Sequence, residues 1–290
     1  MKHFQAMNTP TRRCLWLVLP AVLAACGGGS SDGGPAVTTL SANGLAYTRT
    51  MTVTASGSGL AAPDLQMTVE GAPCINVTRS TGATDSQTAF TCTLQGVGQV
   101  SPRIRKANGD ELARLTVSVP LPLVSMQVRQ GTLSGVMVVE IDPQAAPVTA
   151  LNFMTYVNAG FYRDTLFHRV LPGQIGQGGG YTAGPVFKSP TAAAILLESD
   201  NGLKNLRGTL AMARADAANS AQAQFYFNIS DNPGFDRVSD AQLGYAVFGK
   251  VVTGLEVLDE IGKVETRVFS AALQSLPVVD VVLTSALQTR

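Results

Sequence analysis

Residues 167–180 read F-H-R-V-L-P-G-Q-I-G-Q-G-G-G and join a short apolar strand to a segment with five glycines. Side chains alternate between the two faces of a strand, so we expect His168 and Arg169 on opposite faces. One of these two polar side chains must then point away from the core. Glycine has no Cβ, so the segment that follows can turn sharply and approach other groups closely.

Several common catalytic designs are absent from the sequence around this stretch. Apart from His3, His168 is the only histidine, and no G-x-S-x-G nucleophile elbow of the kind found in many hydrolases is present around this stretch. Neither G-x-G-x-x-G nor G-x-x-x-x-G-K-[ST] occurs near residues 176–180, and a metal site would need more ligands. The residues argue against nucleophilic hydrolysis, phosphate binding and metal chemistry. We expect His168 to be a strand residue satisfied by local hydrogen bonds.

The chain around this stretch has the pattern of an antiparallel barrel. Alternating apolar runs predict strands at 126–128, 135–141, 245–251 and 278–283. A first helix is predicted to begin at Pro143 or Pro147, capped by Asp142, because apolar residues then recur at helical spacing. A second helix is predicted at 255–261. Two helices among many strands and long loops favour a closed barrel with capped ends.

Four motifs in this part of the chain resemble a known family. They occupy 167–179, 201–214, 224–228 and 244–251. Together they resemble the signature of cyclophilin-type peptidyl-prolyl cis-trans isomerases, most like the periplasmic bacterial branch, over roughly 124–290. The resemblance implies an eight-stranded antiparallel barrel capped by two helices. It also implies rotation about the peptide bond before proline, which breaks no bond and needs no cofactor or metal.

The resemblance implies a role for each of ten residues. Arg169 would donate a hydrogen bond to the prolyl nitrogen as the amide twists, and Gln177 would hold the substrate backbone beside it. Further substrate contacts would come from the main chain of Ala213 and Arg214, the side chain of Gln224, a proline pocket lined by Ile175, Tyr226 and Phe235, the pocket floor at Gln174 and the pocket rim at Tyr245.

Some positions depart from the family pattern. Gln174 and Tyr226 stand where the family usually has phenylalanine, and Gly234 stands at the position of the family's tryptophan. An unpaired amide in an apolar pocket would cost about 1 kcal/mol or more. The departures leave an alternative function open, a proline-peptide-binding chaperone or scaffold without catalysis.

Residues 1–25 are typical of a secretory signal. Lys2, Arg12 and Arg13 precede an apolar run that is too short to span a bilayer as a helix. Leu23-Ala24-Ala25-Cys26 resembles the lipobox of bacterial lipoproteins, which implies a lipid on Cys26 followed by a flexible tether over 26–36. We expect a cell-envelope lipoprotein that faces the periplasm, at the outer membrane because Gly27 follows the cysteine. The alternative is an ordinary secretory signal with a chance cysteine.

The amino-acid composition limits the classes of partner that we expect this chain to bind. With 45% apolar residues, 14% charged residues and a net charge of +1, the chain is typical of a globular protein and has no basic cluster for nucleic acid. We expect a monomer whose partners are proline-containing segments of exported proteins and, through the lipid, a membrane.

Residues 37–122 predict a separate β-sandwich of immunoglobulin-like size, followed at 123–290 by the barrel domain. Pro120 and Pro122 mark the boundary, since proline cannot continue a strand ladder. Cys74 and Cys92 remain once the signal and the lipid account for the other two cysteines, so we expect a disulfide between them. A further alternative assigns partner binding to this sandwich, where we find no catalytic constellation.

Overall fold

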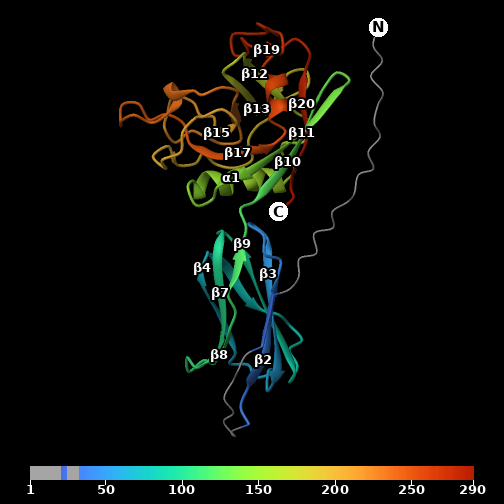
Figure 1. The fold of residues 1–290 in the computed structure, drawn as a ribbon, viewed down its shortest axis with the longest axis vertical. Helices are drawn as coiled ribbons and strands as arrows, with labels where there is room; N and C mark the ends of the chain where they lie inside the picture. Colours follow the sequence, from blue (N-terminus) through green and yellow to red (C-terminus); the bar gives the residue numbers. More distant parts are fainter. Residues whose placement is uncertain (1–20, 25–32) are drawn as a thin grey trace.

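The computed structural model describes residues 21–24 and 33–290. It has two bodies, a β-sandwich and a barrel, joined by the segment between β9 (Val117–Val119) and β10 (Leu123–Gln130) (Figure 1). The expected mainly-β class is therefore confirmed. In the described part of the chain, neither helix is long and apolar enough to cross a membrane. Cys26 and most of the expected signal and tether lie outside the described residues.

Two sheets form the sandwich. One contains β1 (Ala21–Ala24), β2 (Ala36–Asn43), β3 (Thr50–Ser58), β6 (Gln87–Leu94) and β5 (Cys74–Arg79), in that spatial order. The other contains β4 (Gln66–Gly71), β7 (Gly98–Arg105) and β8 (Glu111–Arg114), with β9 also paired to β7. A disulfide joins Cys74 to Cys92 across neighbouring strands. β1 falls within the expected signal, so cleavage after Ala25 would leave β2 as an edge strand.

The barrel is a closed antiparallel sheet of eight strands. Around it run β12 (Thr165–Leu171), β20 (Val281–Gln288), β10, β11 (Leu133–Ile141), β17 (Val247–Thr253), β15 (Thr209–Met212), β16 (Phe225–Asn228) and β13 (Ile175–Thr182), and β13 closes it by pairing with β12. β14 (Val186–Phe187) pairs with the end of β13. A hairpin of β18 (Thr266–Arg267) and β19 (Leu276–Pro277) follows α2 (Leu255–Ile261).

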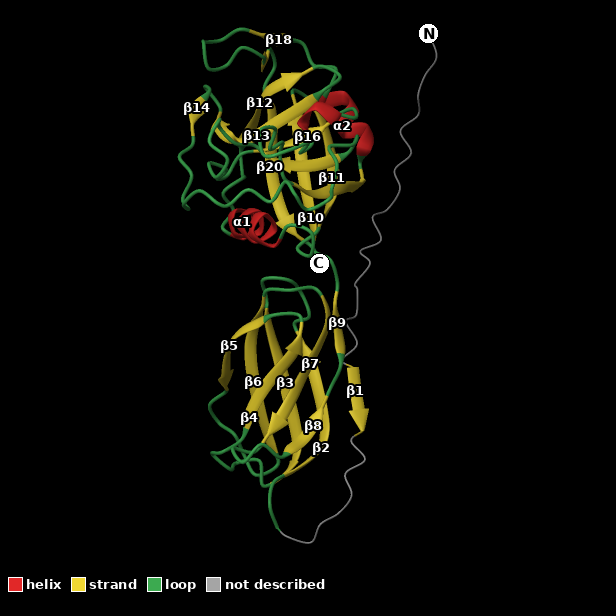
Figure 2. Cartoon of the chain, turned by 90° about the vertical axis from the view of Figure 1, so that its left-hand side faces the viewer, coloured by secondary structure: helices red, strands yellow, loops and turns green. Residues whose placement is uncertain are grey.

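The helices cover different parts of the barrel, with α1 (Pro147–Asn158) on the side of the sandwich and α2 remote from it (Figure 2). The apolar face of α1 inserts Phe153, whose ring centroid lies 5.8 Å from that of Phe225 and 5.1 Å from that of Phe248. These buried rings fill the interior. The core therefore gives the strands a fixed inward face, and the opposite face of β13, β15 and β16 is free to carry a site.

Two sequence expectations about boundaries were wrong. Asp142 does not cap α1: its carboxylate accepts hydrogen bonds from the amides of Gln144 and Ala145, and the helix begins at Pro147, the second of the two expected starts. Glu198, from a distant loop, accepts the amide hydrogen bonds of Val148 and Thr149 at the helix start. The last strand begins at Val281 rather than at residue 278, because the residues before it belong to the turn that follows β19.

The sandwich and the barrel meet through a polar contact and a shared core. The loop between β2 and β3 places Thr48 and Arg49 against Asn158 at the end of α1, with hydrogen bonds of 2.9 and 3.0 Å. Gln288 of β20 donates a hydrogen bond of 2.8 Å to the carbonyl of Tyr47. Tyr47 is buried in a cluster of apolar residues that continues from Val37 in the sandwich into the barrel.

Candidate functional site

A β-bulge decides where Arg169 points. Phe167 pairs with Gly178, and Arg169 pairs with Gln177, so two steps along β12 match one step along β13. The extra residue is His168, and it shifts the alternation of β12 by one position. Phe167 therefore packs inward while Arg169 lies on the outer face of the barrel, beside its partner Gln177.

The glycines of β13 allow this strand to lie directly on the aromatic core. A Cβ at Gly176 would lie 3.6 Å from the ring of Phe167, and one at Gly178 would lie 3.4 Å from the ring of Phe225. On the outer face, Gly180 is restrictive in another way, because a Cβ there would lie 2.5 Å from the side-chain amide of Gln224. The inward positions of β13 are thus kept small, while its outward positions carry the chemistry.

Arg169, Gln177 and Gln224 form a hydrogen-bonded row on the outer face. Arg169 Nη1 donates to Gln177 Oε1 at 3.2 Å, and Gln177 Nε2 donates to Gln224 Oε1 at 2.9 Å. Within the described residues, this is the only hydrogen bond of the Arg169 side chain, and no carboxylate lies within 4.0 Å of it. The exposed guanidinium keeps N–H groups that can bind a ligand.

An apolar cluster lies next to this row, and we call it the slot because the family resemblance implies that the proline ring binds there. Ile175, Tyr226, Ala211 and Val247 form a small buried cluster on the outer face, separate from the barrel core. Phe235 and Tyr245 pack onto it from loops, and the rings of Tyr226, Phe235 and Tyr245 contact one another edge to face at centroid distances of 5.4–5.8 Å. The three residues expected to line a proline pocket, Ile175, Tyr226 and Phe235, thus lie together.

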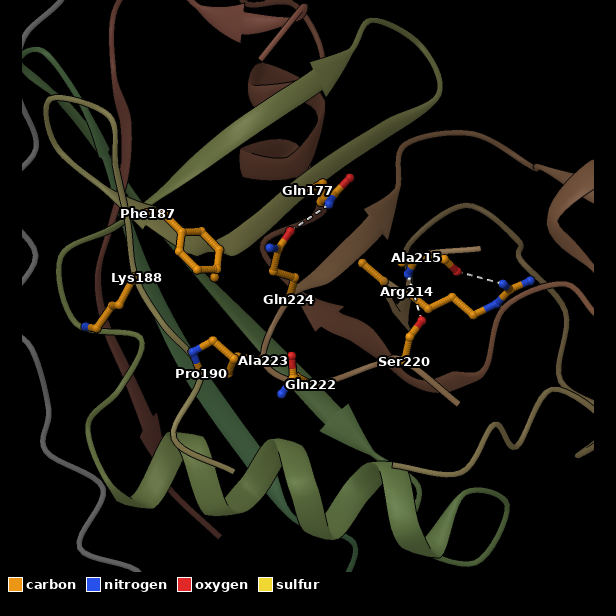
Figure 3. A pocket seen from close by; sticks show the side chains of 12 residues that line it. Gln177, Phe187, Lys188, Pro190, Arg214, Ala215, Ser220, Gln222, Ala223 and Gln224 are labelled. Atoms are coloured by element: carbon orange, nitrogen blue, oxygen red, sulfur yellow. Dashed lines mark hydrogen bonds between the residues drawn. The ribbon is translucent and has the colours of Figure 1, made fainter. Parts of the chain in front are cut away.

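A cavity of about 320 Å³ opens on the other side of Gln177 and Gln224 (Figure 3). Phe187 and Arg214 stand at its two sides, and Ala213 also lines it. Gln177 and Gln224 line this cavity, and Gln177 is also the strand partner of Tyr226 in the slot.

Ala213 and Arg214 are held by internal bonds. The amide of Ala213 donates to the carbonyl of Gln224, which leaves the Ala213 carbonyl as the group free to contact a ligand. The guanidinium of Arg214 donates to the carbonyls of Gly244, Ala215 and Asp216 and lies 4.9 Å from the centre of the Tyr245 ring. Its side chain therefore ties the loops around the slot together.

His168 is buried, and its environment differs from the expected one. Burial lowers its pKa to about 4, although the nearby polar groups of Leu166 and Gln224 oppose this shift. Its ring lies 4.6 Å from that of Tyr181, centroid to centroid, while Nδ1 has no hydrogen-bond partner among the described residues. The expectation that local hydrogen bonds satisfy this histidine was therefore wrong for Nδ1.

Gln174 precedes the first residue of β13 and is half-buried. Its carbonyl accepts hydrogen bonds from the amide of Ile229 and from Asn232 Nδ2, at 2.9 and 3.0 Å. Its side-chain amide makes no hydrogen bond to any residue that the structure describes. The backbone of Gln174, next to Ile175, is therefore fixed, whereas hydrogen bonds to the described residues do not fix the side chain that replaces the family's phenylalanine.

Sequence reasoning missed the residues behind the slot. Asn205 accepts a hydrogen bond of 2.7 Å from the hydroxyl of Tyr226, and Asp236 accepts one of 3.0 Å from Asn205. Asn205 lies in the motif at 201–214, but nothing in the sequence indicates that Asn205 contacts Tyr226 or that Asp236 contacts Asn205, because these residues are far apart in the chain. The only available signal was the tyrosine itself, because a buried hydroxyl needs a partner.

Comparison with known proteins agrees with this geometry. The family described as "Cyclophilin type peptidyl-prolyl cis-trans isomerase/CLD" matches residues 123–286. A relative from Dickeya dadantii named peptidyl-prolyl cis-trans isomerase A is 45% identical, covering 53% of this chain and 80% of the relative. Peptidyl-prolyl cis-trans isomerase B of Escherichia coli is 44% identical, covering 53% of this chain and 94% of that protein. A peptidyl-prolyl cis-trans isomerase from Acinetobacter baylyi is 44% identical, and the match covers 51% of this chain and 77% of that protein.

Proposed function

This chain belongs to the cyclophilin-type peptidyl-prolyl cis-trans isomerases, and we propose that it acts on exported polypeptides while a lipid on Cys26 holds it at the cell envelope. The isomerase activity follows from family membership. The substrate class and the anchoring rest on the lipoprotein-like N-terminus.

The proposed catalytic group is Arg169, and the observation that carries this role is its exposed guanidinium beside the slot, which forms no ion pair with any described residue and keeps N–H groups for a ligand. Amide resonance opposes rotation about the bond before proline, with a barrier of about 18–20 kcal/mol. As the amide twists, the lone pair returns to the prolyl nitrogen, which becomes a hydrogen-bond acceptor. A donor placed there binds the twisted form better than either planar form, and each 1.36 kcal/mol of that preference gives about tenfold in rate.

The remaining groups hold the peptide. The slot formed around Ile175, Tyr226 and Phe235 takes the proline ring, whose burial is favourable because it leaves water. Gln177 binds the peptide backbone next to Arg169, and Gln224 keeps the Gln177 amide in place. The cavity beside Phe187 takes residues that flank the proline.

A refolding assay tests the activity on protein substrates. The form containing residues 27–290 should accelerate the proline-limited refolding of a denatured protein at catalytic concentrations, because that step otherwise takes tens to hundreds of seconds. The same protein refolded from a short denaturation pulse, before its prolines isomerise, serves as the control and should show no acceleration. A folded preparation that leaves the slow phase unchanged would contradict the proposed function.

The envelope anchoring has a separate test. The sandwich begins at Ala36, at the end remote from the barrel (Figure 1), so a tether there would direct the barrel away from the membrane. We expect the full chain to sediment with membranes and to incorporate radiolabelled palmitate in a bacterial host. A Cys26→Ser variant should do neither and should keep its isomerase activity. Palmitate incorporation that persists in Cys26→Ser would refute lipid attachment at this residue.

The second candidate function, peptide binding without turnover, rests on Gln174, whose side-chain amide has no hydrogen-bond partner among the described residues and which lies next to Ile175 of the slot. A Gln174→Phe variant separates the two functions, since it restores the aromatic residue that the family usually has. A rise in kcat of tenfold or more would favour a degraded site in the natural protein. A change within about twofold would favour the working enzyme.

A further inference from the structure

A buried polar network lies directly behind the proline slot. Its centre is Asn205, which is 1% exposed. Asn205 Oδ1 accepts hydrogen bonds from the Tyr226 hydroxyl at 2.7 Å and from Asn228 Nδ2 at 3.2 Å. Its Nδ2 and its backbone amide donate to Asp236 Oδ1, at 3.0 and 2.8 Å, and its carbonyl accepts from the amide of Asn232 at 2.8 Å. Every polar group of Asn205 therefore has a partner.

These partners belong to different walls of the slot. Tyr226 supplies one wall from β16. Asp236 follows η1 (Pro233–Phe235), the short turn that carries Phe235. Asn232, at the other end of this turn, also donates to the carbonyl of Gln174 and to Asn228 Oδ1, and so reaches the start of β13. One asparagine thus connects the aromatic ring, the turn and the strand that together surround the proposed proline ring.

Asparagine suits this position for a chemical reason. The centre must accept from a phenol on one side and donate to a carboxylate on the other, and a side-chain amide does both. An aspartate would place a second carboxylate beside Asp236 and could not donate when ionised. An apolar residue would leave the Tyr226 hydroxyl buried without a partner, which is unfavourable.

We infer that Asn205 is a positioning residue of the isomerase: it fixes the Tyr226 ring and the turn that carries Phe235, and so sets the width of the slot. The inference rests on the proline site proposed above. Asn205 does not touch the substrate itself. Because the slot contacts the proline ring in the planar and the twisted forms alike, its loosening should weaken binding and leave the rate of the bound complex nearly unchanged.

The test uses Asn205→Leu, which keeps the branching and the number of heavy atoms of the side chain and removes its polar groups. We expect KM for a tetrapeptide with an Ala-Pro bond to rise roughly tenfold, while kcat stays within about twofold. A loss of folded protein alone would instead lower the apparent kcat at constant KM. Thr165→Val, which removes a buried hydrogen bond of 2.8 Å to Tyr162 outside the slot, serves as the matched control and should leave KM unchanged.

The double variant Asn205→Leu/Tyr226→Phe provides the rescue. It removes the hydroxyl that Asn205→Leu leaves without a partner, so its KM should fall below that of the single variant. An unchanged KM in Asn205→Leu would overturn the inference. So would a fold-increase in KM for the double variant that equals the product of the fold-increases for the two single variants.

A binding measurement separates this inference from the proposed function. The Kd of the same peptide, obtained by calorimetry, should rise with KM in Asn205→Leu. If the natural chain binds the peptide but does not catalyse its isomerisation, the proposed catalysis fails, and the change in Kd still decides the role of Asn205. If the natural chain binds no peptide, the inference fails as well.

Discussion

At the scale of single residues, His168 links folding stability to pH. Burial lowers its pKa to about 4 from the ordinary value of 6.5, so the unfolded chain binds the proton more readily. The natural protein should lose about 3 kcal/mol of stability through this residue as the pH falls from about 6.5 to about 4. Urea unfolding of the natural chain and of His168→Gln at a series of pH values measures this contribution as a difference.

The expected result is a flatter pH dependence for His168→Gln in this range. Carboxylates also titrate there, but they contribute to both proteins and cancel in the comparison. Parallel curves for the two proteins would show that His168 keeps an ordinary pKa in the folded state.

The residue-scale features divide into those that the sequence could predict and those that it could not. The row of Arg169, Gln177 and Gln224 followed from motifs, because each lies in a short pattern with fixed spacing. Glu198 at the start of α1 and Asn205 behind Tyr226 did not, because their partners lie on other elements. A hydrogen bond between distant segments leaves no periodic trace in a sequence.

At the scale of elements, β13 combines close packing on one face with hydrogen bonding on the other. Gly180→Ala would bring a Cβ to 2.5 Å from the Gln224 amide, which must then move away and lose its bond to Gln177. We expect kcat/KM for a proline peptide to fall roughly tenfold, because Gln177 is no longer held beside Arg169. Steady-state kinetics on the folded variant measures the loss.

Gly234→Ala is the stability control for this substitution, since a Cβ at Gly234 meets no atom within 4 Å. Its thermal midpoint should match that of the natural chain. Unchanged kinetics in Gly180→Ala would mean that the Gln224 amide does not hold Gln177.

Element types were easier to predict than their irregularities. Hydrophobic periodicity predicted four strands of the barrel, the two helices and a closed barrel, whereas the number of eight strands came from the family resemblance. The bulge at His168 did not, because alternation along β12 alone says nothing about its register against β13. Yet this bulge is what turns Arg169 to the outer face, so the most important orientation in the site depends on strand pairing.

At the scale of the whole molecule, we expect the sandwich and the barrel to unfold as one cooperative unit. Asn158 accepts a hydrogen bond from Arg49 and donates one to Thr48, and the apolar core continues beneath them. We expect Asn158→Ala to lower the free energy of unfolding by about 1 kcal/mol. Differential scanning calorimetry should show one cooperative transition for the natural chain, and two separate transitions would contradict this unit.

The disulfide gives a contrasting prediction. Replacing Cys74 and Cys92 by serine opens a loop with a sequence separation of 18 residues, which costs roughly 3 kcal/mol of stability on a loop-entropy estimate. The bridge lies in the sandwich, away from the proline slot, so peptide kinetics at low temperature should be unchanged. A large change in kcat would show that the sandwich influences catalysis directly.

The central claim is that the Arg169 guanidinium lowers the barrier to rotation without any covalent step. The most direct test is kcat for an Ala-Pro peptide, compared between the natural chain, Arg169→Lys and Arg169→Ala. We predict a fall of about 100-fold or more for Arg169→Ala with little change in KM, and an intermediate kcat for Arg169→Lys, which keeps the charge but not the planar donor. An Arg169→Ala variant with the kcat of the natural chain would contradict the account.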